Sequence, residues 1–214
     1  MKPMPRAPRK EKREHPPLFL ITPTDPRYPA HLKQCPGCTP PPTLRAIGNP
    51  ELLLREKIGL VCSVRIPGRV ILQTYEFAKH APQEGPVMVG GFHSPMERQC
   101  LEIFLLRKVS LIICLARSIR TIRIPASWNE SLAEGRLLIL SAVESQQRRP
   151  TKVLAQNRNR IVAALSDRIL VPYASPGGKT DGLAGQAARW GKILLTFEDA
   201  EGSALSSIGA RIIR

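Results

Sequence analysis

The sequence predicts an α/β fold: a doubly wound, Rossmann-like domain with a mostly parallel sheet and helices on both faces. Short apolar runs alternate with longer amphipathic segments from residue 57 onward. The short runs are apolar at successive positions, as strands are when both faces of their sheet are covered. Strands that alternate with helices in this way are typical of parallel sheets with right-handed crossovers.

Six strands and four helices account for this alternation. The expected strands span residues 57–63, 86–89, 109–115, 136–141, 168–172 and 192–197. The expected helices span residues 69–80, 95–107, 152–165 and 180–189. The helix at 95–107 has the clearest start, because Ser94 and Glu97 have the spacing of a capping box and Pro95 lies at the first helical position.

The first fifty residues have a different character. Residues 1–17 hold six Lys or Arg, two Glu and five Pro. We expect a disordered basic arm there, either a solubilising tail or a phosphate-seeking extension. Proline recurs through residues 18–50 and excludes long helices, so we expect an irregular lead-in that wraps the domain surface. Residues 51–214 then form the Rossmann-like domain.

Composition narrows the classes of function. The formal net charge is +15 and the isoelectric point is near 10.3, which favours a polyanionic partner, nucleic acid ahead of an anionic membrane surface. No apolar run approaches the length of about 18 residues that spans a membrane, and the basic start does not resemble a secretory signal. Five cysteines, an odd number, suit a reducing cytosol, so we expect a cytoplasmic protein. Aromatic residues make up only 5%, so recognition should depend on phosphates more than on base stacking.

Segments suited to anion binding converge on one edge of the expected sheet. In a doubly wound sheet the ligand binds beyond the carboxyl ends of the strands. Glycines there let the backbone approach an anion, helix N-termini offer free amides, and arginines bind phosphate through two hydrogen bonds. The candidate phosphate-binding residues are Arg65, Gly90, Gly91, Arg158, Asn159, Arg160, Gly177, Gly178, Lys179 and Thr180.

Two motifs argue against nucleotide-triphosphate hydrolysis and against a bound metal ion. Gly178-Lys179-Thr180 resembles the end of a phosphate loop, but Tyr173 stands where that loop needs its first glycine, which excludes an ATPase. Cys35 and Cys38 form a CxxC close to His31, and the chain holds no second pair to complete a zinc site. We therefore expect no metal and no cofactor.

His93, Ser94 and Glu97 allow two interpretations. An acid–base site would use Glu97 as the carboxylate and His93 as its partner, with Ser94 as a nucleophile. The other interpretation is structural, with Ser94 and Glu97 capping the following helix, and no oxyanion donor or second base is specified nearby. We therefore expect a protein that is not an enzyme.

The chain resembles the DprA/Smf DNA-processing proteins, within a wider group of Rossmann-like domains that includes the LOG phosphoribohydrolases. The resemblance runs from about residue 25 to about residue 197. Asp25-Pro26-Arg27-Tyr28-Pro29 looks like the family's lead-in, and Cys62-Ser63-Val64-Arg65 stands where the family has Gly-Ser-Arg. The most specific match is Arg158-Asn159-Arg160-Ile161-Val162-Ala163-Ala164-Leu165-Ser166. Gly177-Gly178-Lys179-Thr180 parallels the family's glycine loop.

The resemblance implies single-stranded DNA binding in a basic pocket, self-association as a homodimer, and loading of the RecA recombinase during transformation and recombination. The residues it carries over as phosphate contacts are Arg65, Arg158, Asn159, Arg160 and Lys179. Either Arg158 or Arg160 could instead be structural, tying its helix to the Gly177–Lys179 loop. The LOG pattern Pro-Gly-Gly-x-Gly-Thr is broken, because Pro176-Gly177-Gly178-Lys179-Thr180 lacks its last glycine.

Three hypotheses follow. The first is a cytosolic, non-enzymatic protein that binds single-stranded DNA through its phosphates. The second is a nucleotide-binding sensor or a LOG-like hydrolase of a nucleotide's glycosidic bond, with Glu97 as the catalytic carboxylate and His93 assisting. The third is a basic interaction module with a vestigial site.

Overall fold

A computed structural model of the chain describes residues 17–33, 41–144, 147–198 and 205–213. The expected arm at 1–17 lies outside these residues except for its last position, and so do Cys35 and Cys38. The strands are β1 (Leu18–Ile21), β2 (Leu44–Gly48), β3 (Lys57–Leu60), β4 (Val87–Gly90), β5 (Leu111–Leu115), β6 (Leu137–Ser141), β7 (Arg168–Leu170), β8 (Ile193–Phe197) and β9 (Arg211–Ile213). The helices are α1 (Ala30–Lys33), α2 (Gly68–His80), α3 (Pro95–Leu106), α4 (Asn129–Ala133), α5 (Lys152–Leu165) and α6 (Lys179–Arg189).

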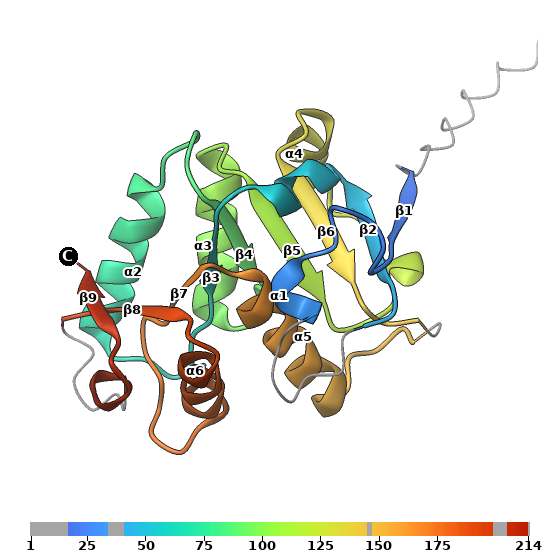
Figure 1. Cartoon of the computed structure of the whole chain (residues 1–214). Helices are drawn as coiled ribbons and strands as arrows, with labels where there is room; N and C mark the ends of the chain where they lie inside the picture. Colours follow the sequence, from blue (N-terminus) through green and yellow to red (C-terminus); the bar gives the residue numbers. More distant parts are fainter. Residues whose placement is uncertain (1–16, 34–40, 145–146, 199–204, 214) are drawn as a thin grey trace, which may run out of the picture.

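The strands form one nine-stranded sheet in the order β1-β2-β6-β5-β4-β3-β7-β8-β9. The strands from β6 to β9 are parallel to their neighbours, whereas β1 and β2 are antiparallel additions at one side. In Figure 1 the arrowheads of β5 and β6 point down, toward the carboxyl edge of the sheet. The predicted fold class is confirmed, and each of the six expected strands and four expected helices has its counterpart.

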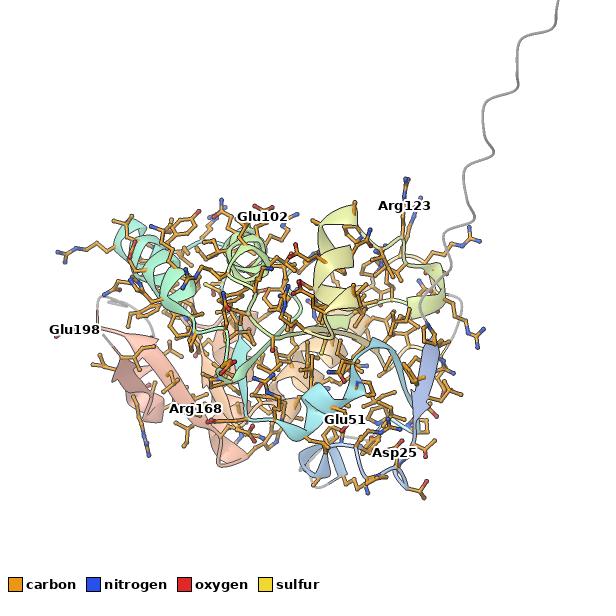
Figure 2. All side chains as sticks on the ribbon, turned by 90° about the horizontal axis from the view of Figure 1, so that it is seen from above. Asp25, Glu51, Glu102, Arg123, Arg168 and Glu198 are labelled. Atoms are coloured by element: carbon orange, nitrogen blue, oxygen red, sulfur yellow. The ribbon has the colours of Figure 1, made fainter. Side chains whose placement is uncertain are left out.

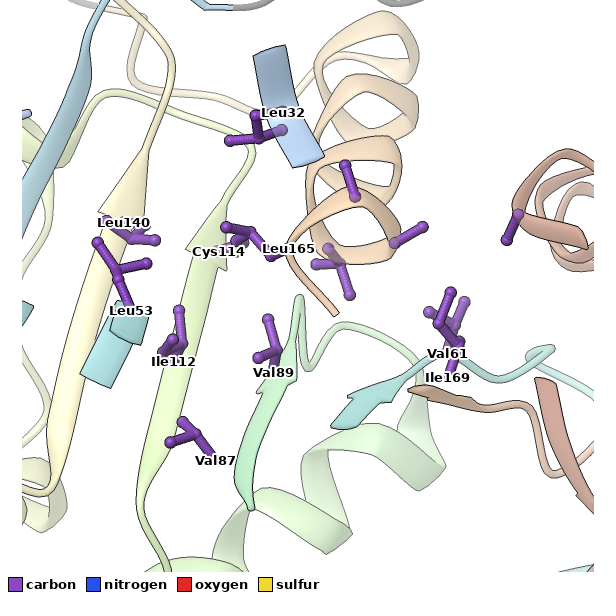
Figure 3. Packing of buried hydrophobic residues seen from close by; sticks show 14 of the residues in the cluster. Leu32, Leu53, Val61, Val87, Val89, Ile112, Cys114, Leu140, Leu165 and Ile169 are labelled. Carbon is purple, nitrogen blue, oxygen red and sulfur yellow. The ribbon is translucent and has the colours of Figure 1, made fainter. Parts of the chain in front are cut away.

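Two apolar clusters hold the layers together. One face of the sheet packs on α1, α5 and α6, and in Figure 3 Ile112 and Cys114 of β5 lie opposite Leu165 of α5. The other face packs on α2 and α3, with Phe104 fully buried. Figure 2, seen from above, shows helices on both sides of the sheet. Both faces of the central strands are therefore dry, which explains why their sequences are apolar throughout.

The expectation of an irregular segment at 18–50 was wrong for two strands and one short helix. β1 and β2 pair with each other, and β2 pairs with β6, so tertiary pairing overrides the local proline content. The described prolines Pro23, Pro26, Pro29, Pro41 and Pro42 lie between β1 and β2, and Pro50 follows β2. The strand β9 was also not expected.

Candidate phosphate-binding edge

The chain changes direction at the centre of the sheet. β3 pairs with β4 on one side and with β7 on the other, which creates the crevice where doubly wound sheets bind ligands. The backbone N–H of Ser63 donates to the carbonyl of Tyr173 at 3.1 Å, and the N–H of Ser175 donates to Ser63 Oγ at 3.0 Å. These bonds tie together the loops that carry Arg65 and Lys179, which are both exposed at this edge.

The glycine loop before α6 is held by its own residues. Gly177 adopts a φ of 69°, which favours glycine, and its N–H donates to Asp181 Oδ2 at 2.9 Å. The N–H of Gly178 donates to the carbonyl of Ser175 at 2.9 Å, and a Cβ at Gly178 would lie 2.8 Å from that oxygen. Lys179 and Thr180 open α6 immediately after. The loop therefore presents Lys179 from a fixed turn.

A groove between α5 and α6 brings three of the predicted residues together. It measures about 300 Å³ and is lined by Asn159, Arg160 and Lys179, with Lys152 and Gln186 alongside. Every charged residue that lines it is basic. Arg160 and Lys179 make no ion pair with any residue that the structure describes. An anion is the complementary ligand for such a groove.

Arg158 lies away from this groove. Its side chain is packed over Gly91, with Nη1 3.4 Å from the Gly91 carbonyl and Nε donating to Asn159 Oδ1 at 2.8 Å. A Cβ at Gly91 would lie 2.4 Å from Arg158 Cζ, so this contact needs glycine. Arg158 is only 8% exposed, and burial lowers the pKa of its guanidinium while the Glu97 charge opposes that change. Arg158 and Gly91 thus form a buried contact between α5 and the end of β4, and not one with the Gly177–Lys179 loop.

Gly90 serves a neighbouring contact. A Cβ on Gly90 would lie 2.9 Å from the ring of Phe92, which is buried and has a φ of 45°. Gly90 therefore makes room for Phe92, and it too faces the interior of the edge.

Glu97 binds backbone amides from two strand ends. Its carboxylate accepts hydrogen bonds from the N–H groups of Cys62 at 3.0 Å, His93 at 2.8 Å and Ser94 at 3.3 Å. Ser94 Oγ in turn accepts from the Glu97 N–H, and the predicted capping box is present. Burial raises the pKa of the Cys62 thiol to about 12, and the nearby Glu97 charge adds to this. Both oxygens of Glu97 are engaged, so the carboxylate holds the loops after β3 and β4 in place.

Charge is distributed unevenly between the two edges of the sheet. At the amino edge, acids pair with bases, as in Lys57–Asp167, Lys108–Glu130 and Arg168–Glu56. The segments that follow the carboxyl ends of β3 to β7 are 61–69, 91–98, 116–125, 142–152 and 171–181, and their described acids are Glu97, Glu144 and Asp181. A fourth described acid, Glu198, follows β8 at the same edge. The basic residues of these segments are Arg65, Arg69, Arg98, Arg117, Arg120, Arg123, Arg148, Arg149, Lys152 and Lys179.

Several of these basic residues were not among the predicted site residues, although the arginine-rich stretch from 115 to 160 was visible in the sequence. The signal that places them is the strand order, because each follows the carboxyl end of a parallel strand. Within the described ranges, no group of three His, Cys, Asp or Glu side chains is arranged to hold a metal ion. Those ranges also contain no helix long and apolar enough to cross a membrane.

Comparisons with known proteins give consistent results. A family model described as DNA recombination-mediator protein A matches residues 19–212. The structure of DNA processing protein A from Streptococcus pneumoniae is similar with a TM-score of 0.74 and 18% identity, covering 94% of this chain and 71% of that one. DNA processing protein A from Helicobacter pylori, studied for its single-stranded DNA binding mode, has a TM-score of 0.74 and 22% identity, covering 93% and 92%.

A more distant similarity reaches a molybdenum cofactor binding protein from Rippkaea orientalis, with a TM-score of 0.52 and 15% identity over 75% of this chain and 90% of that one. At this identity it shows a shared fold only. A search of the curated proteins finds none that matches this sequence.

Proposed function

Since this chain belongs to the DNA recombination-mediator protein A family, we propose that it binds single-stranded DNA through phosphate contacts along the carboxyl edge of its sheet. The observation that carries this proposal is the distribution of charge: basic residues follow the carboxyl ends of successive parallel strands, where few acids accompany them. A polyanion is the ligand that such an edge attracts, and its affinity then depends on salt. The similarity to the Helicobacter pylori protein, studied for its single-stranded DNA binding mode, supports single-stranded DNA as the proposed ligand.

The phosphate contacts fall into two groups in this proposal. Arg65 and Lys179 lie on loops tied together at the crevice beside β3 and β7. Arg160 joins Lys179 from the groove between α5 and α6. Arg158, Gly90 and Gly91 shape the edge from inside it. Gly177, Gly178 and Thr180 fix the turn that presents Lys179.

The function that we propose is not enzymatic. A glycosidic hydrolase would need a carboxylate free to exchange a proton with substrate. Glu97 was the candidate, and it accepts three backbone hydrogen bonds while being 6% exposed. His93 contributes its backbone N–H to Glu97, so the pair is arranged for holding loops.

Its partners follow from the family and are part of the same proposal. A recombination mediator delivers single-stranded DNA to a recombinase, so we propose RecA as a partner, a homodimer as the active form and the cytoplasm as the compartment. Light scattering of the purified protein tests the dimer. The rate at which RecA assembles on a labelled strand, with and without this protein, tests the partnership.

The primary test compares two ligands at two salt concentrations. Fluorescence anisotropy with an oligonucleotide of about 12 thymidines should show binding, and a mononucleotide should show none at the same concentrations. The slope of log K against log salt should be roughly −3 to −4 if four to six phosphates are contacted, since each contributes about −0.7 on a single strand.

The matched variants are Arg65→Ala with Lys179→Ala at the carboxyl edge and Arg107→Ala at the amino edge. The first pair should weaken binding and flatten the salt slope by roughly 1.4. Arg107→Ala removes one exposed charge elsewhere and should leave the slope unchanged. Equal affinity for the mononucleotide and the oligonucleotide would instead support the nucleotide-binding hypothesis.

A further inference from the structure

Arg45, at the β2 end of the carboxyl edge, has buried hydrogen-bond donors without an acceptor among the described residues. Arg45 on β2 lies opposite Ser141, the last residue of β6. Its side chain is 16% exposed, yet its Nε and Nη1 are shielded from solvent and have no hydrogen-bond partner among the described residues. Nη1 lies 3.9 Å from Glu144 Oε1, which is an ion pair but too long for a hydrogen bond. A buried donor without an acceptor is unfavourable, so an incoming acceptor would be stabilised here.

The loop after β5, which contacts the end of β6, also holds a buried polar side chain that lacks a hydrogen-bond partner among the described residues. Ser141 Oγ donates to the Arg117 carbonyl at 2.8 Å and accepts from the Val143 N–H at 3.1 Å, which fixes the loop after β5 against the end of β6. Ser118, which follows Arg117, is 1% exposed, and its Oγ has no hydrogen-bond partner in the part of the chain that is described. Two neighbouring segments thus each hold a polar side chain with buried atoms that have no hydrogen-bond partner within the described ranges.

Further positive charge surrounds this end of the sheet. Arg120 lies in the short turn Ile119–Thr121, which packs on β6, and is exposed. Figure 2 shows Arg123 pointing outward at the β1 end of the molecule, on the same side of the sheet as Glu102. The pairing of β2 with β6 brings Arg45 to this group, although it is about seventy residues away in sequence.

We propose that Arg45, with Ser118 and Arg120 beside it, forms a second phosphate-binding position, and that one strand of DNA lies along the carboxyl edge from the Lys179 loop to Arg45. This inference rests on the proposed function and extends it to the footprint of the strand. A phosphate oxygen accepts several hydrogen bonds and carries negative charge, which matches a hydroxyl and two guanidinium donors that lack a hydrogen-bond partner among the described residues. The Arg45 side chain is 16% exposed, so its guanidinium must rotate outward to present those donors to a phosphate in the solvent.

The strand order sets the length of this footprint. From β7 to β2 the sheet passes through β3, β4, β5 and β6, which makes five spacings of about 4.8 Å, or about 24 Å. A stacked strand places one phosphate every 3.4 Å or so, so about seven nucleotides reach from one position to the other. A strand of about four nucleotides reaches only one of them.

The test measures affinity against oligonucleotide length. Thymidine oligonucleotides of about 4, 8 and 12 nucleotides are compared by anisotropy for the natural protein and for Arg45→Gln, which keeps most of the side-chain stem. The affinity of the natural protein should rise steeply between 4 and 8 nucleotides and little from 8 to 12, because the second position is then engaged. Arg45→Gln should lose about tenfold for the longer strands, the effect of one charge-assisted hydrogen bond, and nothing for the shortest.

Two further variants keep the result interpretable. Arg120→Gln changes an exposed residue of the same group and should repeat the length-dependent loss without affecting folding. Arg107→Gln removes the same charge at the amino edge and should change no affinity. An equal loss at all lengths, or no loss at any length, overturns the second position while single-stranded DNA binding stands. Failure of the natural protein to bind any oligonucleotide overturns the proposed function itself.

Discussion

Arg158 and Arg160 are two residues apart on α5 and should respond to alanine in opposite ways. Arg158 is 8% exposed and contacts Gly91, whereas Arg160 is exposed and lines the groove between α5 and α6. Arg158→Ala should therefore reduce stability, and Arg160→Ala should reduce affinity for single-stranded DNA. Each variant is the control for the other, since both remove one positive charge from the same helix.

The magnitude for Arg158 follows from its contacts. Alanine removes the hydrogen bonds to Gly91 and Asn159, worth about 1 kcal/mol each, and removes a positive charge that interacts with the buried Glu97 carboxylate. We expect a loss of about 2–4 kcal/mol in the free energy of unfolding. For a chain of this size that lowers the melting temperature by roughly 4–16 °C. Arg160→Ala should stay within about 0.5 kcal/mol, as exposed substitutions usually do.

Urea denaturation gives the stabilities, and anisotropy at two salt concentrations gives the binding slopes. Arg160→Ala should flatten the slope of log K against log salt by roughly 0.7, the contribution of one phosphate. The reasoning is refuted if Arg158→Ala keeps its melting temperature and loses affinity, because Arg158 would then be a phosphate contact. Unchanged affinity and slope in Arg160→Ala would remove the groove from the site.

Three other predictions test the interior of the edge. Glu97→Gln should lower stability by about 2–4 kcal/mol, since an amide cannot accept from all three backbone donors. Glu102→Gln, exposed on the same helix, is the control, and equal urea midpoints for the two variants would contradict the prediction. Gly91→Ala should destabilise the natural protein by displacing Arg158 but cost little in an Arg158→Ala background, so additive effects in a double-mutant cycle would refute the contact. Burial raises the pKa of Cys114 to about 12. Above the unfolded-state pKa of about 8.5 the unfolded chain therefore releases a proton that the folded chain keeps, so stability should fall as pH rises from about 8.5 toward 12. Urea denaturation at pH 7 and pH 10 should show a smaller decline in stability for Cys114→Ala than for the natural protein.

The sequence was sufficient to predict the central sheet because its strands are apolar on both faces. It was not sufficient for β1 and β2, which are short and join the sheet because β2 pairs with β6 and β1 pairs with β2. The consequence for the site is direct, since Arg45 enters the carboxyl edge only when β2 is placed next to β6. A proline-rich segment gives no local sign of such pairing, and no spacing in the sequence relates Arg45 to Ser118.

Glu97 shows a different limit. The capping box was readable from four residues, but the bond from the Cys62 N–H crosses 35 positions and depends on β3 lying beside β4. The sequence therefore left the acid–base and structural interpretations of Glu97 open. The geometry favours the structural one, because every oxygen of the carboxylate already has a backbone donor.

The difference between Arg158 and Arg160 was within reach of the sequence. A helix repeats every 3.6 residues, so positions 158, 162 and 165 share one face. Val162 and Leu165 are apolar in sequence and are fully buried in the fold, which places Arg158 on the side that faces the sheet. Two residues of helix turn the chain by about 200°, so Arg160 points away from that face. Treating the two arginines as equivalent phosphate contacts ignored this rotation. The helix instead uses one arginine to join α5 to the end of β4 and offers the other to the groove beside Lys179.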